Sequence, residues 1–78
     1  MTNKTKRIKM PFDCVIMDKE SKEIANPYTG AKALLTPEAI AVYDTIKGAE
    51  MMGQYETMEK GIAWFQANYP KEYFVLLD

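Results

Sequence analysis

The chain has 78 residues, of which 47% are hydrophobic and 12% are aromatic, and its formal net charge is −1. A chain of this length forms one small domain that buries only about 60% of its unfolded surface. No apolar run approaches the roughly 20 residues that a membrane-spanning helix requires, and the first ten residues lack the apolar stretch of a secretory signal. The single cysteine, Cys14, excludes an intrachain disulfide and favours a reducing compartment. We therefore expect a cytoplasmic protein with no membrane partner.

The charges are distributed unevenly along the chain. The first ten residues carry four cations and no acid, at Lys4, Lys6, Arg7 and Lys9. The remaining six cations are set against all eleven acids, which gives residues 11–78 a net charge of −5. We expect residues 1–10 to form a flexible basic arm and residues 11–78 to form a single acidic domain. The arm either keeps the terminus solvated or binds nucleic acid or an acidic partner.

Residues 11–25 are predicted to form a β-hairpin. The apolar run 12–17 is rich in strand-forming residues, and Lys22–Ala25 can return beside it after the polar turn 18–21. A two-stranded hairpin is barely stable alone, so we expect it to pack against helices.

A turn follows at residues 26–30, where Asn26 opens it and Gly30 can adopt positive φ. Residues 31–35 are either a third short strand or an extended segment that buries Leu34 and Leu35.

The stretch from Thr36 to Met52 is predicted to be the central helix. Thr36 can cap its first turn, followed by Pro37 and Glu38, and Gly53 can end it in a left-handed conformation. One predicted buried face comprises Ala39, Val42, Tyr43, Ile46 and Ala49, with Ile40 on its flank.

A second helix is predicted from Thr57, as its cap, to Asn68, with Met58, Ile62, Phe65 and Tyr69 on one apolar face. The short link favours an antiparallel helix pair. Gly48 and Gly61 lie beside the two apolar faces and are expected where the backbones approach.

The apolar tail 70–78 is predicted to be a short third helix, with a buried strand as the alternative. In the helical reading Tyr73, Phe74, Leu76 and Leu77 pack inward. The predicted fold class is therefore α+β, with an N-terminal β-hairpin packed on an antiparallel helix pair and closed by a short C-terminal helix.

Trp64 lies about 120° from the apolar face of the second helix, at ~100° per residue. It is either covered by the N-terminal hairpin or exposed. An exposed Trp64 would be an anchor for a protein partner, because tryptophan and tyrosine dominate binding hot spots. Met51, Met52 and Tyr55 would extend the same protein-binding patch.

The sequence offers little catalytic chemistry. It contains no histidine, the commonest general base near neutral pH, and no glycine-rich phosphate loop. Cys14 lies in an apolar run, where a buried, unreactive thiol is the favoured interpretation. Asp18, Glu20 and Glu23 lack the spacing of a calcium loop. We expect no enzyme activity, no cofactor and no metal.

Two helices joined by a turn also suggest a DNA-binding helix-turn-helix motif. Its recognition helix would lack the excess positive charge that phosphate binding requires, since Glu56 and Glu59 are set against Lys60.

The segments NPYTG, LTPEAIAVYDTIKGAEMMG and YPKEYFVLLD resemble small uncharacterised proteins encoded by tailed bacteriophages, over residues 26–78. The resemblance implies a phage protein made in the cytoplasm of a bacterial host and supplies no functional residues. The predicted function is a non-enzymatic interaction module for a host or virion protein. Nucleic-acid binding through Lys4, Lys6, Arg7 and Lys9 is the alternative, and a homodimer is left open.

Overall fold

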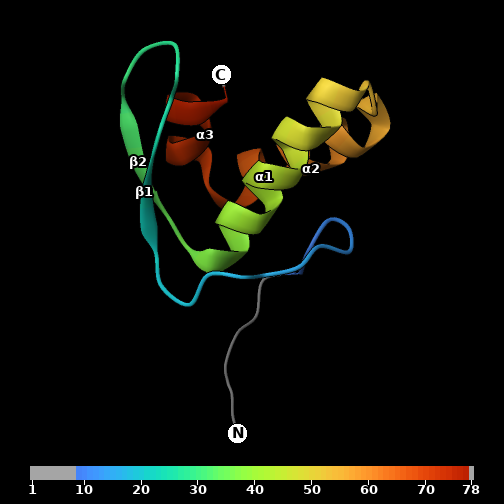
Figure 1. Ribbon diagram of the computed structural model, residues 1–78, viewed down its shortest axis with the longest axis horizontal. Coiled ribbons are helices and arrows are strands. Elements are labelled where there is room, and N and C mark those ends of the chain that lie inside the picture. Colours follow the sequence, from blue (N-terminus) through green and yellow to red (C-terminus); the bar gives the residue numbers. More distant parts are fainter. Residues whose placement is uncertain (1–8, 78) are drawn as a thin grey trace, which may run out of the picture.

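The computed structural model describes residues 9–77 and has the predicted α+β fold (Figure 1). Two strands, β1 (Lys22–Ala25) and β2 (Lys32–Leu35), precede three helices, α1 (Pro37–Met52), α2 (Tyr55–Asn68) and α3 (Pro70–Leu76). The hairpin lies beside α3, and the segment before β1 runs along α1 and α2 in this view. Lys4, Lys6 and Arg7 of the predicted arm lie outside the described residues.

The hairpin exists, but its strands are not the predicted pair. β1 pairs antiparallel with β2, with Lys22 opposite Leu35 and Ala25 opposite Lys32. The run 12–17 forms no strand; Phe12 and Cys14 pack against the hydrophobic core instead. Of the two alternatives for residues 31–35, the strand is the one observed, as β2. It places Leu35 in the core and leaves Leu34 61% exposed, so the alternative that buries both leucines is wrong.

The turn between the strands is built around Asn26. Its side-chain oxygen accepts hydrogen bonds from the backbone N–H groups of Tyr28, at 2.8 Å, and Thr29, at 3.4 Å, and Gly30 has φ +78°. Its side-chain amide donates to the carbonyl oxygen of Val75 in α3, at 2.8 Å. One buried side chain therefore shapes the turn and fastens it to the C-terminal helix.

Helix α1 begins and ends as predicted. The Thr36 hydroxyl accepts a hydrogen bond from the N–H of Ala39 at 3.2 Å, and Gly53 adopts φ +73°. The N–H of Gln54 then bonds to the carbonyl of Ala49 at 2.8 Å, which pairs a carbonyl that the helix end leaves free. The predicted buried residues are all buried, and Ala41 joins them: Ala39, Ile40, Ala41, Val42, Tyr43, Ile46 and Ala49.

Helix α2 begins at Tyr55, two residues before the predicted cap, and Thr57 lies inside it. Gln54 precedes it without a side-chain capping bond, so the link between the helices is only Gly53 and Gln54. The left-handed turn at Gly53 ends α1, and α2 begins two residues later at Tyr55. The two helices pack against each other.

The two helices lie close together at Gly61. A Cβ atom on Gly61 would lie 2.8 Å from Ile46 Cδ1, closer than real contacts allow, whereas a Cβ on Gly48 would meet nothing within 4 Å. The prediction is confirmed for Gly61 and wrong for Gly48, which lies on a side of α1 that no element covers closely.

The tail is helical, as predicted. Its Leu76 is 2% exposed and belongs to the core. Leu77 and Tyr73 are partly buried against the core, but Phe74 is 66% exposed and does not pack inward as predicted. Helix α3 contacts α2 and β2. The core is one cluster, formed by Leu35, Ala39, Ile40, Val42, Tyr43, Ile46, Trp64, Phe65 and Leu76.

Candidate interaction surface

Three large apolar side chains are exposed where α1 turns into α2. Met51 is 86% exposed, Met52 73% and Tyr55 63%. They are held outward because the left-handed turn at Gly53 ends α1 and starts α2 at once, which leaves these positions on the outside of the bend. We call these three residues the corner patch. All three were predicted as protein-contact residues.

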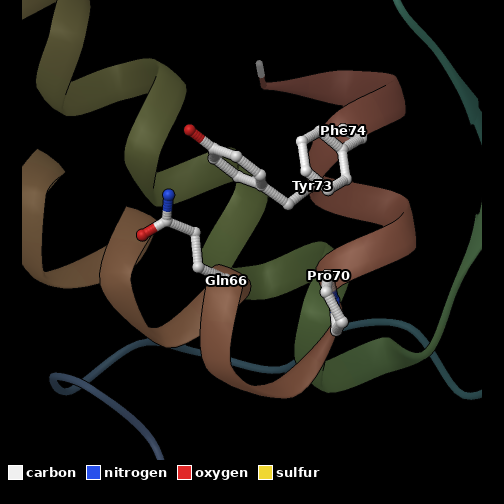
Figure 2. Close-up of a pocket in the computed structure, with 4 residues that line it drawn as sticks. All are labelled: Gln66, Pro70, Tyr73 and Phe74. Atoms are coloured by element: carbon white, nitrogen blue, oxygen red, sulfur yellow. The ribbon is translucent and has the colours of Figure 1, made fainter.

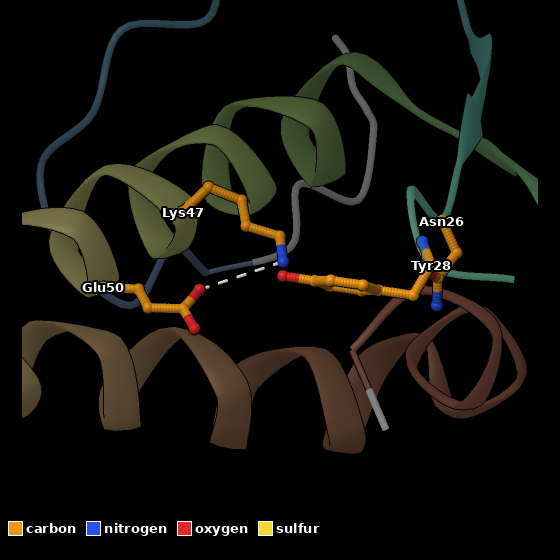
Figure 3. A network of polar contacts seen from close by, with 4 residues as sticks. All are labelled: Asn26, Tyr28, Lys47 and Glu50. Carbon is orange, nitrogen blue, oxygen red and sulfur yellow. Dashed lines mark hydrogen bonds and ion pairs between the residues drawn. The ribbon is translucent and has the colours of Figure 1, made fainter.

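The corner patch continues into a groove between α1 and the hairpin turn. Met51 lines this groove together with residues from β1, the turn and α1, and the groove has a volume of about 610 Å³; the other lining residues are Ile24, Ala25, Pro27, Tyr28, Tyr43, Lys47 and Glu50. We call it the Tyr28 groove. Tyr28 is 89% exposed, and its ring extends from the turn toward Lys47 (Figure 3).

Tyr28 also borders a second hollow, of about 280 Å³, on the side of α2 and α3. Lys47 and Glu50 line both spaces, and the floor of the second is apolar, with Ile46, Met58, Ile62, Leu76 and Leu77. A hollow with an apolar floor and a few polar groups at its mouth is typical of a binding site for apolar side chains.

The polar groups at the mouth of these two spaces make only long contacts with one another. Lys47 Nζ lies 3.8 Å from a Glu50 carboxylate oxygen (Figure 3) and 5.7 Å from the centre of the Tyr43 ring. Burial raises the pKa of the Tyr43 hydroxyl, and the negative charges of Asp44 and Glu50 raise it further. Tyr43 therefore stays neutral at physiological pH. The side chains of Lys47 and Glu50 are partly exposed, so groups from a partner can reach them.

Trp64 is buried, at 8% exposed, so it is not part of the exposed corner patch. Its indole N–H donates to the carbonyl oxygen of Lys9 at 2.6 Å, and its ring lies 5.5 Å from the rings of Phe65 and Tyr69. The buried alternative is the one observed, and the contact is with Lys9, which precedes the predicted hairpin.

A further shallow pocket lies between the end of α2 and α3. Gln66, Pro70, Tyr73 and Phe74 line its volume of about 270 Å³ (Figure 2). The Tyr73 ring projects from α3 toward the side where Gln66 lies. Sequence reasoning missed this pocket and the Tyr28 groove alike, because it assigned Phe74 to the core and Tyr28 only to the turn.

Reactive groups are scarce in the part of the chain that the structure describes. Among residues 9–77 no cluster of three or more histidine, cysteine or acidic side chains has the geometry to hold a metal ion. Partial burial raises the pKa of the Cys14 thiol, and the neighbouring Asp13 raises it further. The thiol is therefore protonated near neutral pH, as expected of an unreactive cysteine.

Of the four cations predicted to bind nucleic acid, Lys9 lies within the described residues and is exposed. No helix of residues 9–77 combines the length and apolar character needed to cross a membrane. Comparison of the chain with protein-family models, with curated protein sequences and with solved structures finds no match.

Proposed function

We propose that the protein is a non-enzymatic interaction module whose contact surface is the corner patch together with the Tyr28 groove. The observation that carries this proposal is the exposure of Met51, Met52 and Tyr55 within five consecutive positions, next to a groove that Met51 itself lines. A small domain gains nothing in stability from three such side chains in water, whereas burial in an interface stabilises a complex.

The chemistry of the surface suits a protein partner. Methionine side chains are flexible and adapt to irregular apolar surfaces, and tyrosine contributes a large ring with a polar end. The corner patch would contact the partner's apolar side chains, while the Tyr28 groove accepts a projecting one beside Lys47 and Glu50. The resemblance to small phage proteins makes a bacterial host protein or a virion protein the partner to seek.

Affinity capture from bacterial lysate, followed by titration of the purified partner, tests this proposal. In the double variant Met52→Gln/Tyr55→Gln, we expect the affinity to fall by about tenfold or more, because hot-spot side chains typically contribute at least that much. Phe74→Gln is the matched control, since Phe74 is exposed to a similar degree, 66%, but lies on α3. It should bind like the wild type.

Undiminished binding by a double variant with an unchanged melting temperature would remove the corner patch from the interface. A mobility-shift titration at two salt concentrations tests the alternative function, nucleic-acid binding. Affinity that falls steeply with salt and vanishes when residues 1–8 are deleted would instead assign the function to the basic arm.

A further inference from the structure

The segment 9–15 packs against the helix pair through apolar side chains and is bent at Pro11 and Phe12. Met10, Phe12 and Cys14 are partly buried and pack against the core, whereas Asp13 and Val15 are exposed. Three apolar side chains of this segment therefore face the hydrophobic core. We call residues 9–15 the strap.

Two contacts define how the strap is seated. At its start, the carbonyl oxygen of Lys9 accepts the indole N–H of Trp64 at 2.6 Å. At its centre, the Phe12 ring lies against Gly61, where a Cβ atom would come within 3.4 Å of Phe12 Cε2. The absence of a side chain at Gly61 thus leaves a notch between α1 and α2 that holds an aromatic ring.

The strap is held without a β-ladder. Within the described part of the chain, residues 9–21 make no backbone–backbone hydrogen bond. The residues that follow the strap are exposed and irregular, with Val15 77% and Met17 83% exposed. Segments with few backbone hydrogen bonds and few buried contacts open locally at low cost compared with the rest of a fold.

We propose that the cleft beneath the strap is a peptide-binding site and that the strap is its built-in occupant. The ligand class follows from the occupant: a short segment with three apolar side chains, the central one aromatic, and a main-chain carbonyl placed to accept from Trp64. Leaving Trp64 bare in water is unfavourable, so a partner segment replaces the strap rather than entering an empty cleft. This site is separate from the corner patch and does not depend on it.

The test uses the full-length chain and a fluorescently labelled synthetic peptide of residues 9–17 with serine at position 14. Phe12→Ala in the protein weakens the strap but leaves the peptide intact. The tethered strap competes at a high effective concentration, and weakening it raises the fraction of protein able to bind. We therefore expect the variant to bind the peptide at least about tenfold more tightly than the wild type does.

Two controls locate the binding. A peptide that carries Phe12→Ala should bind the variant at least about tenfold more weakly, because it cannot fill the notch at Gly61. The label on the bound peptide should also quench the emission of Trp64, the chain's single tryptophan, because the bound peptide would lie against it. Phe74→Ala in the protein removes an exposed ring elsewhere and should leave peptide binding at the wild-type level.

Met10→Ala removes a smaller contact of the strap and serves where Phe12→Ala does not fold. It should change peptide affinity in the same direction. Equal binding of the intact peptide by wild type and by both folded variants, or equal binding of the two peptides, would overturn the proposal and make the strap a fixed part of the core.

Discussion

At the scale of single residues, the two helical glycines have opposite surroundings. Gly61→Ala should lower the free energy of unfolding by about 1–3 kcal/mol, the usual cost of forcing extra volume into a packed site, because its Cβ would overlap Ile46. Gly48→Ala should raise it by up to about 1 kcal/mol, since alanine is the better helix former and its Cβ meets nothing within 4 Å. Urea denaturation of both variants measures the difference.

A loss of stability in Gly48→Ala, or none in Gly61→Ala, would contradict this assignment of the close approach. The sequence placed both glycines beside apolar faces and could not rank them. The rank depends on which part of α1 meets α2. Phe12 and Ile46 contact the Gly61 position from distant parts of the sequence, so the pattern around Gly61 does not reveal the contact.

At the scale of elements, Asn26 joins the hairpin turn to α3. Asn26→Asp keeps an oxygen for the N–H of Tyr28 but loses the amide that donates to the carbonyl of Val75. We expect a loss of about 1–3 kcal/mol, the cost of leaving a buried polar group unpaired. Lowering the pH should reduce the loss, because the protonated carboxyl group regains a donor. Thermal unfolding at two pH values measures both effects.

Thr29→Ala is the control for this variant. It removes an exposed hydroxyl that accepts from the N–H of Ala31, so its effect should stay within about 0.5 kcal/mol. An Asn26→Asp variant as stable as Thr29→Ala would show that the turn and α3 are coupled by packing and not by this hydrogen bond.

The elements differ in how far the sequence predicted them. The start and end of α1 and the turn at Asn26 were predicted correctly, because each depends on groups within five residues of one another. The strand pairing was predicted wrongly. The run 12–17 has strand-forming residues, but its Phe12 and Cys14 pack against the core without forming a strand. The partner of Asn26 in α3 is 49 residues away, beyond the reach of any local pattern.

The same limit applies to the candidate surface. The exposed corner patch was predicted because Met51, Met52 and Tyr55 flank a helix end that the sequence marks clearly. The Tyr28 groove was missed because it exists only where β1, the hairpin turn and α1 meet. Trp64 was left between two alternatives because its cover, Lys9, lies 55 residues away.

At the scale of the whole molecule, one cluster holds every element together, and the last turn of the chain contributes to it. Leu76 is 2% exposed and belongs to the same cluster as Leu35 and Phe65. A domain of this size has a stability of only about 4–12 kcal/mol, at about 0.05–0.15 kcal/mol per residue. A single large cavity therefore affects folding as a whole and not one helix alone.

Leu76→Ala should cost about 2–5 kcal/mol, the range for emptying a buried leucine site, and should lower the unfolding transition of the whole chain. Phe74→Ala, two positions earlier but 66% exposed, should change stability by about 0.5 kcal/mol or less. Urea unfolding followed both by far-ultraviolet circular dichroism and by Trp64 fluorescence distinguishes the two outcomes. In Leu76→Ala the two signals should shift together, because Trp64 on α2 shares the core with α3. A transition that moves in one signal alone would mean that α3 unfolds independently of the helix pair, and Leu76 would then stabilise only its own helix.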